Sequence, residues 1–210
     1  KTNDYSNILK PIISARYSPN NSKKARNDDR RINVNNVFSL NRLGSNDSVE
    51  GGGSLTFGTE FYNTDSSKRE VLNLKIANVF KLEEDQNLSL NSSLGNKTSD
   101  IIGELDYNPN DFFSLNYEFS QDQNLKDTNY QMLKNEFKIN NFVTTFEYLN
   151  ENNGINKDSY LSNKTSYNFN EASSFIFETR ENKKTNATEF YNLMYQYRND
   201  CLIAAIQYNK

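Results

Sequence analysis

The chain has 210 residues, of which 35% are hydrophobic and 13% aromatic, and its formal net charge of -3 comes from 24 basic and 27 acidic residues. The near balance of charges argues against nucleic acid as a partner, and the aromatic content argues against a disordered chain, although the mean hydropathy is -0.88. The sequence contains no His, which excludes Ser-His and Cys-His catalytic dyads and imidazole-bound zinc. No stretch approaches the ~20 apolar residues of a membrane helix, so contact with a bilayer core would require strands closed into a barrel.

The sequence starts without an initiator Met and without an apolar leader segment. We therefore expect either a mature form or a piece cut from a longer chain, and we favour the piece. The first candidate strand, at residues 8–18, shows only weak alternation of apolar and polar residues.

Alternation with a period of two then runs through most of the sequence. In residues 54–62, for example, Leu55, Phe57 and Phe61 share one face, and polar residues occupy the other. The pattern recurs in residues 72–80, 101–107, 113–119, 133–139, 142–148, 161–169, 174–178, 191–198 and 202–208. Residues 32–40 and 87–94 are two further weak candidates. The sequence thus predicts an all-β, antiparallel protein with about a dozen strands.

The predicted connections differ in length. Tight turns are expected at residues 108–111, 140–141 and 169–172. Longer polar links are expected at residues 19–31, 62–69, 120–128, 149–158 and 181–187. Short turns at one end and longer loops at the other are typical of an up-and-down outer-membrane β-barrel.

The two faces of the predicted strands do not by themselves separate a membrane barrel from a soluble sheet protein. A soluble protein turns its apolar face to a core and an outer-membrane barrel turns it to lipid, so both predict alternation. Tyr residues near the strand ends, among them Tyr107, Tyr148 and Tyr191, favour the barrel because aromatic girdles mark the membrane interfaces.

Residues 9–19 (LKPIISARYSP), residues 36–58, which contain NRLGSNDSVEGG, and residues 197–201 (YRNDC) are three distinctive stretches. Together they resemble the LPS-assembly protein LptD family of outer-membrane proteins. Residues 9–19, LKPIISARYSP, are similar to the family's "L-x-P-x-x-x-x-x-Y-x-P" strand. Residues 36–58, NVFSLNRLGSNDSVEGGGSLTFG, resemble its "NRFSG-x-DR-x-EGG" segment, and residues 197–201, YRNDC, resemble the C-terminal "Y-x-(N/D)-x-C" before the last strand. The resemblance implies the C-terminal portion of a larger transmembrane barrel, with residues 1–210 as one part of that domain.

The second of these stretches contains a candidate loop site. Its residues are Asn41, Arg42, Asp47, Glu50, Gly51 and Gly52. The charged members can pair with one another or with neighbouring loops, while the glycines permit a positive φ on the way into the next strand. The alternative is a flexible loop with solvated charges. In the family such loops cap the lumen or fold into it.

The resemblance also assigns roles to the C-terminal residues. Cys201, the only cysteine, stands where the family bridges the barrel to a periplasmic N-terminal domain; otherwise it is an unpaired residue in a turn. Residues 201–208 become the last strand and one side of a lateral gate. The residues of that strand expected to face lipid are Leu202, Ala204, Ile206 and Tyr208.

The function implied is lipopolysaccharide (LPS) transport and assembly in the cell outer membrane, without catalysis, cofactor or metal. The implied partners are LPS, an LptE-like plug lipoprotein, a periplasmic bridge component of the LPS transport system and outer-membrane lipid, with no nucleic acid. A basic cluster, formed by Lys23, Lys24, Arg26, Arg30 and Arg31, could meet LPS phosphates, although acids are interleaved with it.

Two alternatives remain open from the sequence. One is a stand-alone barrel of about twelve strands, acting as a pore or an autotransporter-like secretion domain. In that barrel residues 8–18 would pair with residues 202–208. The other is a soluble β-sandwich that binds glycans.

Overall fold

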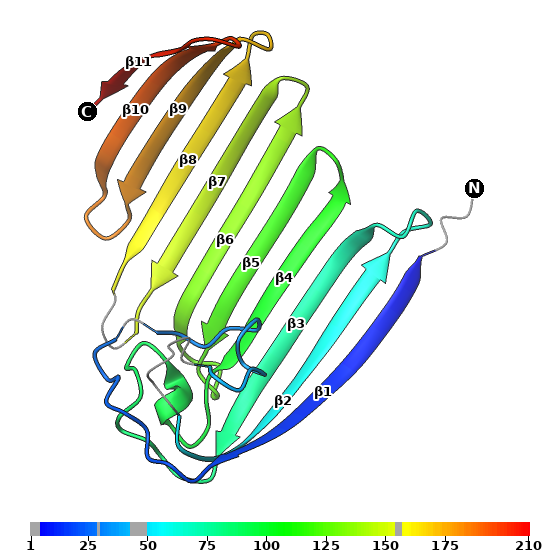
Figure 1. The fold of residues 1–210 in the computed structure, drawn as a ribbon, viewed down its shortest axis with the longest axis vertical. Coiled ribbons are helices and arrows are strands. Elements are labelled where there is room, and N and C mark those ends of the chain that lie inside the picture. Colours follow the sequence, from blue (N-terminus) through cyan, green and yellow to red (C-terminus); the bar gives the residue numbers. More distant parts are fainter. Residues whose placement is uncertain (1–4, 29, 43–49, 154–156) are drawn as a thin grey trace.

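The computed structural model describes residues 5–28, 30–42, 50–153 and 157–210. These residues form one antiparallel sheet of eleven strands in chain order (Figure 1). The strands are β1 (Ser6–Ser18), β2 (Gly52–Thr64), β3 (Glu70–Lys81), β4 (Ile101–Asn110), β5 (Phe113–Gln121), β6 (Thr128–Ile139), β7 (Phe142–Glu151), β8 (Ser159–Asn168), β9 (Ser173–Asn182), β10 (Ala187–Arg198) and β11 (Ile203–Asn209). The only helix among the described residues is the short 3-10 helix η1 (Ser93–Gly95), so none of them forms a helix able to cross a membrane.

The ten strongly alternating runs correspond to β2–β11, and the weak candidate at residues 8–18 is β1. Strands β1–β10 have 9 to 13 residues each, enough to cross a bilayer core, which needs about 9–11 residues per tilted strand. The last strand is shorter, with 7 residues, and starts at Ile203, so the expected start at Cys201 is wrong. Cys201 and Leu202 belong to the preceding turn, where the Asn199 side chain accepts hydrogen bonds from both backbone N–H groups.

The strands predicted at residues 32–40 and 87–94 are wrong, because both segments fold as turns within the two long loops. In the first, the Asn33 side chain accepts hydrogen bonds from the backbone N–H groups of Asn35 and Asn36, so the backbone turns instead of extending. In the second, Ser92 caps η1 by accepting a hydrogen bond from Leu94 N–H at 3.2 Å.

One face of the sheet is apolar and exposed. The register places Leu55 beside Phe80, Phe142 beside Tyr167, and Tyr195 beside Ile206. Most large hydrophobic side chains of this face are exposed, and Ile206 reaches 77%. A soluble sandwich would cover this face with a second layer, and no described residue forms one. The described strands form a single sheet, so the alternative of a two-sheet sandwich does not hold for these residues.

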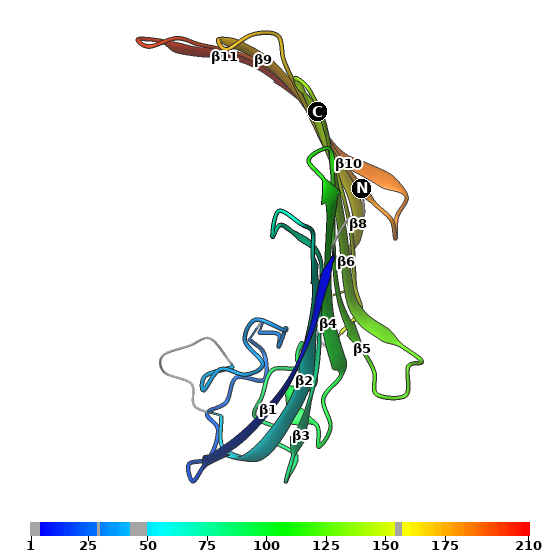
Figure 2. The ribbon, with the colours of Figure 1, turned by 90° about the vertical axis from the view of Figure 1, so that its right-hand side faces the viewer.

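The opposite face is polar and concave, and it carries the only hydrophobic core of the described residues. Figure 2 shows the curved sheet edge-on, with the loops after β1 and β3 on its concave side. In this core, Ala77 and Val79 of β3 and Ile102 of β4 pack against loop residues. The loop residues in the core are Ile32, Val37, Leu88 and Leu94. The loops thus cover part of the polar face instead of projecting freely from the sheet.

The connections are sorted by length between the two ends of the sheet. At the end where β1 meets β2, which we call the loop end, the links include residues 19–51 and 82–100. At the other end, the turn end, no link within the described residues is longer than the turn at 65–69. The predicted long link at 62–69 is therefore wrong: β2 and β3 extend further, and Asp65 closes the turn by accepting hydrogen bonds from the N–H groups of Ser67 and Arg69.

The sheet is not closed. In the described part of the chain, β1 pairs with β2 alone and β11 with β10 alone. The pairing of residues 8–18 with residues 202–208, which a stand-alone barrel requires, is absent from these residues. Figure 1 shows β1 and β11 at opposite edges of the sheet.

Candidate functional site

The candidate loop site centres on a buried ion pair between Arg42 and Glu50. The Arg42 guanidinium donates hydrogen bonds to both carboxylate oxygens of Glu50, from Nε at 2.9 Å and from Nη2 at 2.5 Å. The two side chains are 1% exposed. Arg42 also donates to the hydroxyl oxygens of Ser54 (2.8 Å) and Thr56 (3.2 Å) on the polar face of β2. Arg42 and Glu50, eight positions apart in the sequence, are thus partners in one buried ion pair.

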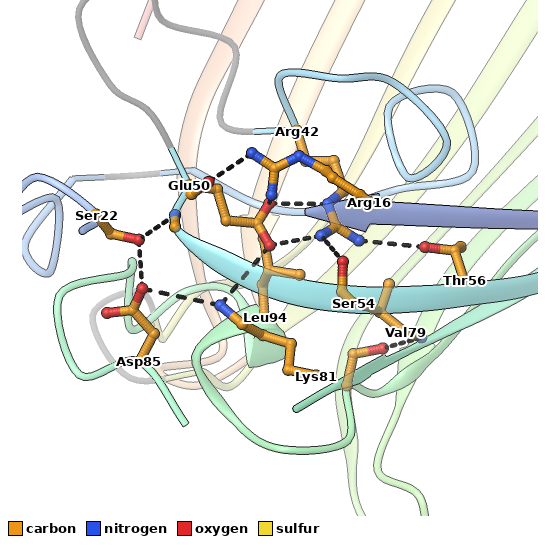
Figure 3. A network of polar contacts seen from close by, with 12 residues as sticks. Arg16, Ser22, Arg42, Glu50, Ser54, Thr56, Val79, Lys81, Asp85 and Leu94 are labelled. Carbon is orange, nitrogen blue, oxygen red and sulfur yellow. Dashed lines mark hydrogen bonds and ion pairs between the residues drawn. The ribbon is translucent and has the colours of Figure 1, made fainter. Parts of the chain in front are cut away.

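Two further cations approach Glu50 from neighbouring strands (Figure 3). Arg16 of β1 lies 3.2 Å from the carboxylate and donates a hydrogen bond to the Glu50 backbone carbonyl at 2.6 Å. Lys81, the last residue of β3, lies 3.7 Å from Glu50 and 3.8 Å from Asp85. We call Arg16, Arg42, Glu50, Lys81 and Asp85 the ionic cluster.

The ionic cluster joins both long loops to the first three strands. Asp85 accepts a hydrogen bond from the Ser22 hydroxyl, whose oxygen in turn accepts one from Gly51 N–H at 2.7 Å. Arg16 also donates to the Leu40 carbonyl at 3.0 Å. Residues 40–42, residues 50–51 and the loop that follows β3 are therefore held together at one point on the polar face of the sheet.

The glycines that enter β2 have the roles that the sequence predicts for small residues. Gly52 has a φ of 78°, in the left-handed region that glycine adopts without strain. A Cβ atom on Gly51 would lie 2.1 Å from the Asn20 carbonyl oxygen, so the backbones approach too closely for any side chain.

The ionic cluster carries three cations against two carboxylates. Within the described residues, Arg16 Nη1 and Lys81 Nζ are buried and have no hydrogen-bond partner, although both lie within ion-pair distance of Glu50. A buried charge is tolerated only when opposite charges compensate for its desolvation. Glu50 is thus the counter-ion of the whole cluster, and the described residues contain no group of His, Cys, Asp or Glu suited to a metal ion.

The other predicted site residues lie elsewhere. Asn41 is exposed beside Arg42, and Asp47 falls outside the described residues. Cys201 is exposed and unpaired within the described chain, at the turn end between β10 and β11. Cys201 is therefore not part of the ionic cluster, which lies at the loop end of β1–β3.

The candidate gate residues lie on the last strand. Ala204 and Ile206 pair with Tyr197 and Tyr195 on the apolar face, and Tyr208 pairs with Leu193. Leu202 is exposed in the turn that precedes β11.

The basic cluster is dispersed by local partners. Arg30 pairs with Asp28 at 3.2 Å, and Arg31 pairs with Glu151 at 3.1 Å. Arg26 donates to the backbone and side-chain oxygens of Gln86. These cations therefore do not form a single site for a phosphate.

Sequence reasoning missed Arg16, Lys81 and Asp85. The available signal was a charged residue at the loop end of each of β1 and β3, on the polar face of the alternation. Period-two alternation assigns a residue to a face, but it does not reveal which charges meet across strands.

A comparison with protein families places the chain. The family model of LptD, LPS transport system D, matches residues 1–182, which end with the last residue of β9. A comparison with curated proteins found no match. The LptD family consists of outer-membrane transport proteins rather than enzymes, with LPS as the substrate and the other components of the LPS transport system as partners. Because the match covers most of the chain and the fold is the expected all-β sheet, this chain belongs to the LptD family.

Proposed function

We propose that this chain forms the C-terminal part of the wall of a larger barrel that inserts LPS into the outer leaflet of the outer membrane. The observation that supports this most is the opposite character of the two faces. The convex face is apolar and exposed, as a lipid-facing wall requires, and the concave face is polar, as a hydrated lumen requires. The loop end then faces the cell exterior and the turn end the periplasm, because outer-membrane barrels have their short turns in the periplasm.

In this proposal LPS uses both faces of the wall. Its sugars cross through the polar lumen, because their hydroxyl groups need hydrogen-bond partners that lipid does not offer. Its acyl chains leave sideways between the first and last strands of the complete barrel. We take β11 as the last strand of that barrel because residues 197–201 resemble the family's segment before its last strand. The β11 residues Ala204, Ile206 and Tyr208, with Leu202 in the turn before them, would line the lipid side of this lateral gate.

The ionic cluster has a positioning role in this account. It holds the loop of residues 19–51 and the loop of residues 82–100 against the concave face, so that both loops narrow the lumen at its outer end. Such loops would keep water and small solutes from crossing the membrane through the resting channel. The cluster performs no chemistry on LPS.

Two partners follow from the same proposal. An LptE-like lipoprotein would fill the concave space that the described loops leave open, and a periplasmic bridge component would deliver LPS from the turn end. Cys201 is exposed at the turn end, where a disulfide to a periplasmic N-terminal domain would form. A mobility change on reduction of the full-length protein, abolished by Cys201→Ser, would support this bridge, and a mobility indifferent to reductant would contradict it.

Site-specific photo-cross-linking tests the gate. A photoreactive amino acid is placed at Ala204 or Ile206 in the full-length protein in cells, and at Phe146 as a control on the same apolar face in the middle of the sheet. We expect LPS adducts at the two β11 positions and only phospholipid contact at Phe146.

Equal LPS adducts at all three positions would mean that LPS touches the wall merely from the outer leaflet. The absence of LPS adducts at both β11 positions would contradict the assignment of β11 to the lateral gate. Two results would favour the stand-alone pore. The protein extracted from the membrane would have the mass of this chain alone, and cysteines placed in β1 and β11 would form a disulfide cross-link.

A further inference from the structure

A polar cavity at the loop end has no role in the proposal above. Its volume is about 450 Å³, within the ~300–1,000 Å³ range of small-molecule sites. It is enclosed by the loop of residues 82–100, the segment around Arg26 and Arg31, and the loop ends of β5, β6 and β7. It is separate from the ionic cluster except for Asp85, which borders both.

The lining of this cavity consists mainly of amide and hydroxyl groups. Asn129 and Ser120 both donate to Asp100 Oδ2, at 2.8 and 2.7 Å, so this carboxylate is held in place. The Ser93 hydroxyl accepts a hydrogen bond from Asp100 N–H at 2.7 Å. The lining is thus organised before any ligand arrives, which reduces the entropy lost on binding.

One lining residue has an unused acceptor. Within the described residues, Asn153 Oδ1 is buried and has no hydrogen-bond partner, although its Nδ2 donates to Glu151 at 3.0 Å. Because this oxygen is buried, a ligand in the cavity does not reach it, and Asn153 contributes to the wall of the cavity. Glu151 is in turn held by Arg31, whose guanidinium lies 3.3 Å from the centre of the Tyr130 ring.

The charges of the lining select among ligands. Two cations, Arg26 and Arg31, face two carboxylates, Asp85 and Asp100, in the same cavity. A phosphate would be attracted by the two guanidinium groups and repelled by the two carboxylates, so this lining gives no net preference for an anion. A sugar hydroxyl both donates and accepts, so it can bond to carboxylates, amides and guanidinium groups alike. Acyl chains are disfavoured because the cavity offers little apolar surface.

From these observations we infer that the loop-end cavity binds an uncharged sugar unit of the LPS saccharide as it leaves the lumen. This inference rests on the proposed function, which places LPS in the lumen and the loop end outside. The sugar would occupy the space beside Asp100, Asn129 and Asn152, with its hydroxyl groups bonding to the carboxylate and amide groups of this lining.

The test uses the full-length protein, purified in detergent with its plug partner. The probe is the saccharide of the cell's LPS, freed of acyl chains and dephosphorylated, and binding is measured by calorimetry. Asn152→Trp fills the cavity from an exposed position, and Asn129→Ala removes an amide that lines the cavity and holds Asp100. Asn124→Trp, exposed at the same end but outside the cavity lining, is the matched control.

We expect the unsubstituted protein and Asn124→Trp to bind the saccharide equally and the two cavity variants to bind it at least tenfold more weakly. Inorganic phosphate should not compete. The inference is overturned by undetectable binding to the unsubstituted protein, by unchanged binding in both cavity variants, or by competition from phosphate. The β11 cross-linking of LPS reports on the proposed function independently, so cross-links without saccharide binding would reject this site alone.

Discussion

Glu50 is the residue on which the loop-end architecture depends most. Three cationic side chains surround its carboxylate, and the side chain is 1% exposed. A buried ion pair is often no more stabilising than apolar side chains of the same shape, but the loss of one partner leaves the others as uncompensated buried charges. The consequence is large and can be measured.

We expect Glu50→Gln to lower the free energy of unfolding by about 3–5 kcal/mol, because the amide keeps the shape of the carboxylate and removes its charge. Glu60→Gln is the control, because Glu60 pairs with the exposed Lys10 at 3.5 Å, and exposed pairs contribute about 0–1 kcal/mol. Denaturant titration of the full-length protein in detergent gives both values. Equal effects of the two substitutions would contradict the central role of Glu50.

The sequence predicts this site only in part. Arg42 and Glu50 are eight positions apart in one polar loop, so their pairing could be anticipated from the sequence alone. Arg16 and Lys81 lie on strands far from Glu50 in the sequence, and their approach depends on the strand register. The register is a product of tertiary folding and is not visible in a single alternating run.

The two long loops are the elements that sequence patterns describe least well. Residues 32–40 and 87–94 alternate like strands, but four of their apolar side chains pack onto Ala77, Val79 and Ile102 of the sheet. These four are Ile32, Val37, Leu88 and Leu94. A short apolar run cannot distinguish a strand from a loop that contributes to a core. The side chains of Asn33 and Ser92, which accept backbone hydrogen bonds in turns, are the residues in these segments that indicate loops rather than strands.

The packing of the second loop predicts a specific weakness. Leu94, the middle residue of η1, is fully buried in the core, and its replacement by Ala should destabilise the packed loop by about 2–5 kcal/mol through the cavity it leaves. The expected result is faster proteolysis within residues 82–100 of the native protein, with the strands intact. Leu40→Ala is the control, because Leu40 is 85% exposed in the other loop. Unchanged proteolysis of Leu94→Ala would show that the core does not hold this loop.

At the scale of the whole molecule, the order of the strands could be predicted from the sequence. Which of the two faces lies on the concave side of the sheet could not. Tight turns at residues 140–141 and 169–172 specify antiparallel neighbours, so the up-and-down topology follows from local sequence. Alternation alone fits both a soluble core and a lipid-facing wall. The curvature of the sheet and the docking of both loops on the polar face show which face is concave.

The most direct test of this account compares adjacent residues of β8 that point to opposite faces. Leu161 lies on the apolar face beside Tyr148, and Ser162 lies on the polar face beside Glu147. Each is replaced by Cys in the full-length protein in outer membranes, a water-soluble maleimide is added, and the unsubstituted protein sets the background. The account predicts labelling at Ser162→Cys and protection at Leu161→Cys. Protection at Ser162→Cys together with labelling at Leu161→Cys, or equal labelling at both, would contradict a wall with lipid on its convex face and a hydrated lumen on its concave face.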